Sequence, residues 1–91
     1  MTLIRQHLFI TGRVQGVCFR YFTRQEALKN GVGGWVRNLP DGRVEALIEG
    51  ADLAVKATVA WCHTGPDLGR VDQIVIEEQE FIGEFETFKI R

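Results

Sequence analysis

A glycine-flanked segment near the amino end carries residue types that bind phosphate. Residues 12–20 read GRVQGVCFR, so that Gly12 and Gly16 flank three residues and Arg20 closes the segment. Glycine allows backbone angles that turn successive N–H groups inward, and a row of such amides at a helix start binds anions. The Arg20 guanidinium adds a permanently charged fork that suits phosphate oxygens. The segment predicts a phosphate-binding loop, and a tight turn with a surface arginine is the alternative that these residues leave open.

Asn38 is a second residue that could take part in chemistry at this loop. It ends a predicted strand, directly before a predicted turn at residues 39–42. Its amide can donate to one oxygen and accept from a water, so it could orient a water toward a bound phosphorus atom. Asparagine is also common in turns, so a purely structural role stays open from its position alone.

Cys18 and Arg24 match the Cys-x5-Arg spacing of thiol-dependent phosphatases. In such a site a thiolate attacks phosphorus, which requires a loop whose amides face the phosphate. Here residues 19–23 are Phe, Arg, Tyr, Phe and Thr, which are bulky and compatible with a helix. We therefore expect Cys18 to be a small, partly buried neighbour of the loop. A Walker nucleotide loop is excluded because no Lys-Ser/Thr pair follows Gly16.

The composition predicts one small domain over residues 1–91. A formal net charge of -1 argues against nucleic-acid and membrane partners. The chain has neither an apolar run that could span a bilayer nor a start that reads as a secretory signal, so we expect a cytoplasmic protein with Cys18 and Cys62 reduced. These cysteines, with His7 and His63, lack the paired spacing of a zinc site, and we expect neither metal nor cofactor.

Periodicity and turn residues predict the elements that position the loop. Helices are expected at residues 19–30, ended by Gly31, and again after Gly50, with Asp52 as N-cap and a stop at Gly65-Pro66. Strands are expected at residues 6–11, 34–38, 43–49, 71–78 and 85–91. The segment Pro40-Asp41-Gly42 predicts a hairpin turn between the second and third of these strands.

The order of these elements predicts an α+β fold. Strand, helix, two strands, helix and strand form a split β-α-β arrangement, in which an antiparallel sheet carries both helices on one face, and the last strand is an addition. We expect the first strand to lie centrally with the hairpin strands beside it, which would bring Asn38 toward the loop. The positions expected to point inward are Phe19, Thr23, Ala27, Thr58, Phe88 and Ile90.

Two motifs resemble those of the acylphosphatases. One is the whole of residues 12–20, and the other is GWVRN at residues 34–38, followed by Gly42, Val44 and Gly50 at similar intervals. The helix that reaches Trp61, its Gly65-Pro66 stop and the closing FKIR at residues 88–91 extend the resemblance over nearly the whole chain.

The resemblance implies a ferredoxin-like α+β sandwich and a metal-independent hydrolase of acyl phosphates. It implies that Arg20 stabilises the transition state and that Asn38 positions the attacking water. The phosphate would be held by the backbone amides of Gln15, Gly16, Val17, Cys18, Phe19 and Arg20. We expect a monomer that takes a small acyl phosphate and releases inorganic phosphate. We also expect the terminal carboxylate to lie near Arg20, and a non-catalytic phosphate-sensing module remains the alternative.

Overall fold

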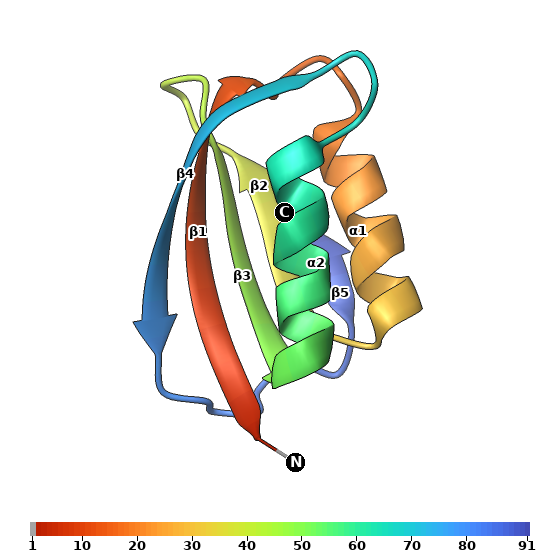
Figure 1. The fold of residues 1–91 in the computed structure, drawn as a ribbon, viewed down its shortest axis with the longest axis vertical. Coiled ribbons are helices and arrows are strands. Elements are labelled where there is room, and N and C mark those ends of the chain that lie inside the picture. Colours follow the sequence, from red (N-terminus) through yellow and green to blue (C-terminus); the bar gives the residue numbers. More distant parts are fainter. Residues whose placement is uncertain (1) are drawn as a thin grey trace.

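The structure, a computed structural model, describes residues 2–91 as five strands and two helices (Figure 1). In chain order these are β1 (Leu3–Arg13), α1 (Phe19–Asn30), β2 (Gly33–Asn38), β3 (Val44–Ala51), α2 (Asp52–Thr64), β4 (Arg70–Gln79) and β5 (Phe88–Ile90). The predicted β-α-β-β-α-β order with one additional strand is confirmed.

The strands form one sheet in the order β4-β1-β3-β2-β5. Antiparallel pairs join β1 to β3 and β4, and β2 to β3. Because β3 lies between β1 and β2, the expectation that both hairpin strands flank the first strand is wrong. β5 pairs with β2 in parallel, so the sheet is mixed and not purely antiparallel. The reason is that the chain, after β4, runs past the lower ends of the strands in the view of Figure 1. It then enters β5 at the end of the sheet where β2 also starts.

Both helices cover the same face of the sheet, as predicted (Figure 1). Helix α1 buries Phe19, Thr23 and Ala27 against it, which confirms the face expected from their four-residue spacing. The predicted burial of Thr58 in α2 is also confirmed, and its hydroxyl is satisfied there because it accepts from Asn30 Nδ2 and donates to the carbonyl of Ala54, both at 2.9 Å. No helix within residues 2–91 combines the length and the apolar character needed to cross a membrane.

Several element ends differ from the expected ones. β1 and β4 are longer than residues 6–11 and 71–78, because their ladder continues beyond the hydrophobic alternation. Helix α2 starts at Asp52, and its N-cap is Ala51 without a side-chain hydrogen bond. The Asp52 carboxylate instead accepts from the N–H of Leu53 at 2.8 Å. The prediction of Asp52 as N-cap is therefore wrong by one residue.

The last strand is shorter than expected, since only Phe88–Ile90 of residues 85–91 pairs with the sheet. Phe88 is fully buried, as predicted. Ile90 is 42% exposed, so its expected inward position is wrong. It lines a surface pocket together with Phe19, Arg20 and Tyr21 of α1.

The predicted turn between β2 and β3 is confirmed. Leu39 donates its N–H to the carbonyl of Arg43 at 2.8 Å, and Gly42 donates to the carbonyl of Leu39 at 3.1 Å. Gly42 has a φ of 95°, which a side chain would oppose. This turn and the loop between β1 and α1 lie at the same end of the sheet (Figure 1).

Candidate active site

The loop between β1 and α1 has the backbone geometry of an anion nest. Gly16 has a φ of 74° and Cys18 a φ of 63°, whereas Val17 between them is not left-handed. Alternation of this kind points successive N–H groups to one side and forms a concave site for an anion. Within residues 2–91, Cys18 is the sole non-glycine residue with a positive φ.

The amides of this loop are available to a ligand. Apart from bonds inside helices and strands, the backbone hydrogen bonds within residues 2–91 include none donated by the N–H groups of residues 15–21. The bond from the Phe22 N–H to the Cys18 carbonyl closes the first turn of α1. That turn carries no acidic residue, and Cys18 provides no side-chain cap. The partial positive charge of the helix start is thus left uncompensated by the protein. We call residues 15–20 the amide loop.

A pocket of about 420 Å³ opens at the amide loop, and we call it the loop pocket. It is lined by Val14, Gly16, Cys18, Phe19, Arg20, Tyr21 and Ile90. Arg20 is partly exposed, and the ion pairs and side-chain hydrogen bonds within residues 2–91 include none from its guanidinium. A fixed positive charge therefore stands beside the unpaired amides, with its donors available to an anion.

Asn38 is held next to this loop from a different part of the chain. The Gln15 side chain donates from Nε2 to the carbonyl of Leu39 at 2.8 Å and to that of Arg43 at 2.9 Å. Leu39 directly follows Asn38, so the two bonds join the amide loop to the turn at the end of β2. The Asn38 Oδ1 atom is buried without a hydrogen-bond partner, the only side-chain atom in that state within residues 2–91. Buried polar atoms normally have partners, so the described residues leave the acceptor capacity of this oxygen unused.

The structure adds three features that the sequence did not indicate. Gln15 was expected to contribute only its amide, yet its side chain bridges two loops that are 24 residues apart. Tyr21 and Ile90 line the loop pocket from α1 and β5. No local sequence signal predicts the Gln15 bridge or the position of Ile90, because both depend on which strands lie next to one another in the sheet.

One expectation about neighbouring groups is wrong, and a second has no ion pair to support it. Cys18 is exposed and not partly buried, because its left-handed backbone turns it out of the core. The ion pairs within residues 2–91 do not include one between Arg20 and the terminal carboxylate. The Arg91 N–H donates to the Val36 carbonyl at 2.8 Å, and its guanidinium lies over the Trp35 ring.

The residues between Cys18 and Arg24 all lie in α1. They do not form the loop that a thiol-dependent phosphatase needs, so this alternative has no structural support. Burial raises the pKa of the other thiol, Cys62, to about 12, despite its hydrogen bond with Thr23. Among residues 2–91, no three His, Cys, Asp or Glu side chains gather as a metal site would require.

Comparison with known proteins agrees with the motifs. The model of the family described as Acylphosphatase matches residues 6–90. An acylphosphatase of Syntrophobacter fumaroxidans is 50% identical over 94% of this chain and 89% of its own, and one of Geobacter sulfurreducens is 49% identical over 97% of both. The crystal structure of acylphosphatase from Bacillus subtilis superposes with a TM-score of 0.93 at 38% identity and covers 99% of each chain. With matches of this length and identity, the chain belongs to the acylphosphatase family, hydrolases that act on the acid anhydride of acyl phosphates.

Proposed function

We propose that the amide loop, Arg20 and Asn38 carry out the hydrolysis of acyl phosphates to carboxylate and inorganic phosphate. The observation that supports this most directly is the row of unpaired amides at the start of α1, which the Gln15 side chain joins to the turn that follows Asn38. The loop amides suit a phosphate, and a side-chain amide such as that of Asn38 can hold a water.

In this proposal the phosphate oxygens accept hydrogen bonds from the loop. The donors are the backbone amides of Gln15, Gly16, Val17, Cys18, Phe19 and Arg20. The Arg20 guanidinium binds the same group and offsets the negative charge that the oxygens carry in the transition state. Preorganised donors of this kind are worth about 10²- to 10³-fold each in rate, which suits a reaction that needs positioning and charge stabilisation more than covalent chemistry.

Asn38 holds the water that attacks phosphorus from the side opposite the acyl oxygen. A water oxygen–phosphorus bond forms, the phosphorus–oxygen bond to the acyl group breaks, and its electron pair leaves on the carboxylate. The protons of the water pass to the phosphate and to solvent. Since a carboxylate is a good leaving group, the step as proposed uses neither a general acid nor a metal.

We also propose that the enzyme acts as a monomer in the cytoplasm on a small-molecule acyl phosphate. One chain provides all the residues that line the loop pocket, so a second copy is not needed to complete it. Both cysteines are free, which fits a reducing compartment.

Three substitutions test the residue roles, with acetyl phosphate as substrate and a chelator present. We expect Arg20→Ala to lower kcat/KM by about 10³-fold and to weaken inhibition by phosphate, because Arg20 binds the phosphate group itself. Asn38→Ala should lower kcat by about 10²-fold while phosphate inhibition stays within threefold. Arg24→Ala is the matched control. This arginine lies in the same helix, but it does not line the loop pocket, and it forms none of the ion pairs within residues 2–91.

The outcomes separate the alternatives. Full activity in Asn38→Ala would remove the water-positioning role. Phosphate binding without turnover in the wild-type protein would indicate a sensing module. Loss of activity in Arg24→Ala would support the thiol mechanism, and loss of activity with chelator would contradict the metal-independent step.

A further inference from the structure

A second pocket of about 410 Å³ adjoins the amide loop, and we call it the side pocket. Cys18 lines both this pocket and the loop pocket. Val17, the neighbouring residue in the amide loop, also lines the side pocket. Cys18 therefore borders both the loop pocket and the side pocket.

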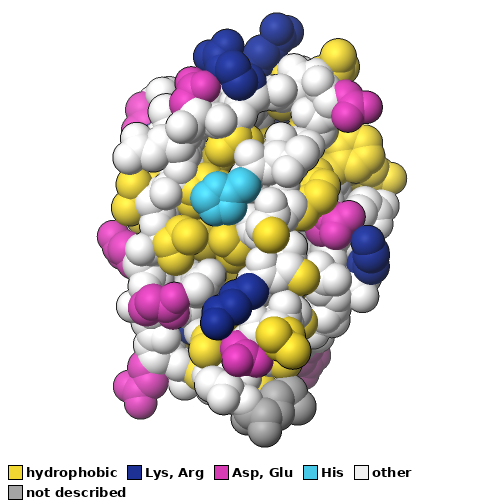
Figure 2. All heavy atoms as spheres, in the orientation of Figure 1, with side chains coloured by type: hydrophobic (Ala, Val, Ile, Leu, Met, Phe, Trp, Pro, Cys, Tyr) yellow, Lys and Arg dark blue, Asp and Glu magenta, His cyan; other side chains and the backbone are white. Residues whose placement is uncertain are grey.

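The walls of the side pocket are largely apolar and come from three parts of the chain. Phe22 extends from α1, Trp61 from α2, and Pro66 and Leu68 from the segment between α2 and β4. Phe22 is 43% exposed and Leu68 is 75% exposed. Figure 2 shows hydrophobic side chains gathered at the upper right of the molecule, where Figure 1 places the start of α1 and the segment after α2. Large apolar side chains that gather at the surface around a polar site are typical of a ligand-binding groove.

The side pocket has one charged wall residue, Asp67. Its carboxylate would oppose a second negative charge on a bound acyl phosphate, since like charges in a confined site repel. The pocket also offers far more apolar surface than the single methyl of an acetyl group can cover. Its chemistry thus matches an uncharged acyl group with an aromatic ring or a branched chain.

We propose that the side pocket is the acyl subsite and that the enzyme prefers acyl phosphates whose acyl group is uncharged and apolar. The phosphate lies in the amide loop, and the acyl group crosses Cys18 to pack between Phe22 and Leu68. This inference rests on the proposed function and specifies its substrate class.

The first test compares kcat/KM for benzoyl phosphate and for acetyl phosphate. Leu68→Ala should lower the benzoyl-to-acetyl ratio about tenfold. Leu53→Ala is the matched control, because Leu53 is 78% exposed on α2 and lines neither pocket, and it should leave the ratio unchanged. Because Leu68 is exposed, its truncation does not touch the core.

An unchanged ratio in Leu68→Ala would overturn the acyl subsite while acetyl phosphate turnover still supports the proposed function. A changed ratio in Ile90→Ala, with none in Leu68→Ala, would place the acyl group on the opposite wall and would also overturn it. If the wild-type protein hydrolyses neither substrate, the proposed function itself fails, and the acyl subsite with it.

The second test addresses Asp67 with 4-carboxybenzoyl phosphate. Asp67→Asn should raise kcat/KM for this substrate by about threefold to tenfold, the range expected for one repulsive charge near a protein surface. Benzoyl phosphate, which has no second charge, should show no such gain. Equal effects on both substrates would contradict the position of the acyl group beside Asp67.

Discussion

Cys18 shows how one residue's backbone serves the amide loop at a cost in stability. A left-handed conformation costs a non-glycine residue about 1–2 kcal/mol, and Cys18 adopts it with a φ of 63°. This conformation turns its amide to the same side as its neighbours, as an anion nest requires. The structure thus retains local strain where the phosphate is expected to bind.

Replacing Cys18 should reveal this strain in the free energy of unfolding. Cys18→Gly is expected to stabilise the protein by about 0.5–1 kcal/mol, because relief of the left-handed cost exceeds the extra chain entropy of glycine. Cys18→Val should be less stable than the wild type, because a β-branched side chain fits this conformation poorly. Urea unfolding at neutral pH measures both. Equal stability of the glycine and valine variants would show that the backbone at this residue carries no strain.

At the scale of elements, the site depends on the contact between two loops. The amide loop follows β1, Asn38 ends β2, and β3 lies between these strands. The Gln15 side chain spans the gap with its two hydrogen bonds to the β2–β3 turn. We infer that Gln15 is a positioning residue that sets the distance between the bound phosphate and the water held by Asn38.

Gln15→Met tests this, since it keeps the shape of the side chain and removes its donors without adding charge. We expect kcat to fall about tenfold or more, because small misplacement of a reacting group is costly, while phosphate inhibition stays within threefold. Gln73→Met, at an exposed position in β4, is the control. In an Asn38→Ala background the Gln15→Met substitution should have no further effect on kcat. An undiminished effect in that background would show that Gln15 does not act through Asn38.

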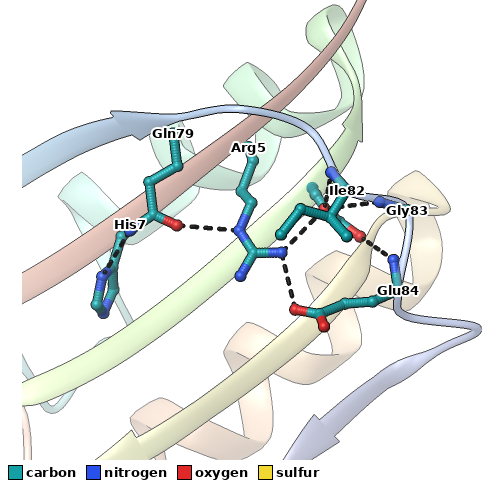
Figure 3. Close-up of polar contacts among 7 residues, drawn as sticks. Arg5, His7, Gln79, Ile82, Gly83 and Glu84 are labelled. Atoms are coloured by element: carbon teal, nitrogen blue, oxygen red, sulfur yellow. Dashed lines mark hydrogen bonds and ion pairs between the residues drawn. The ribbon is translucent and has the colours of Figure 1, made fainter.

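At the scale of the whole molecule, a buried carboxylate attaches the segment between β4 and β5 to the sheet. Glu49 accepts from the N–H groups of Ile82 and Gly83 at 3.3 Å and of Glu84 at 2.9 Å, and from Arg5 at 3.4 Å (Figure 3). This segment leads the chain to β5, whose Ile90 lines the loop pocket. Burial opposes ionisation of Glu49, but these donors outweigh it and hold the pKa of the carboxyl below its usual value.

Stability should therefore depend on pH through Glu49. Because its pKa is lower in the folded state than in the unfolded chain, its contribution is complete above the ordinary value of 4.5 and is lost as the pH falls below it. Glu49→Gln should destabilise the protein by about 1.5–3 kcal/mol at pH 7, the range for hydrogen bonds to a charged group. Urea unfolding at pH 7 and at pH 3 measures both proteins. A difference between them that is as large at pH 3 as at pH 7 would mean that the Glu49 charge contributes nothing.

The sequence by itself determined the features that depend on neighbouring residues. Helix α1 and its end at Gly31, the turn at Gly42, and the burial of Thr58 follow from spacing and turn chemistry over a few residues. Their hydrogen bonds are local, so the pattern that predicts them also contains the partners that form them. The motif at residues 12–20 likewise placed the glycines and Arg20 at one loop, because they lie within nine positions of one another.

Only the tertiary structure decided how distant segments meet at this loop. The position of β3 between β1 and β2, the parallel pairing of β5, the exposure of Ile90 and the bridge from Gln15 to the β2–β3 turn were absent from the sequence-based prediction. Each is set by competition among packing arrangements of the whole chain, in which residues far apart in sequence bury surface together. Spacing along the chain specifies which residues of one loop can bind a phosphate. The packing of the sheet decides which residues from distant segments lie next to that loop.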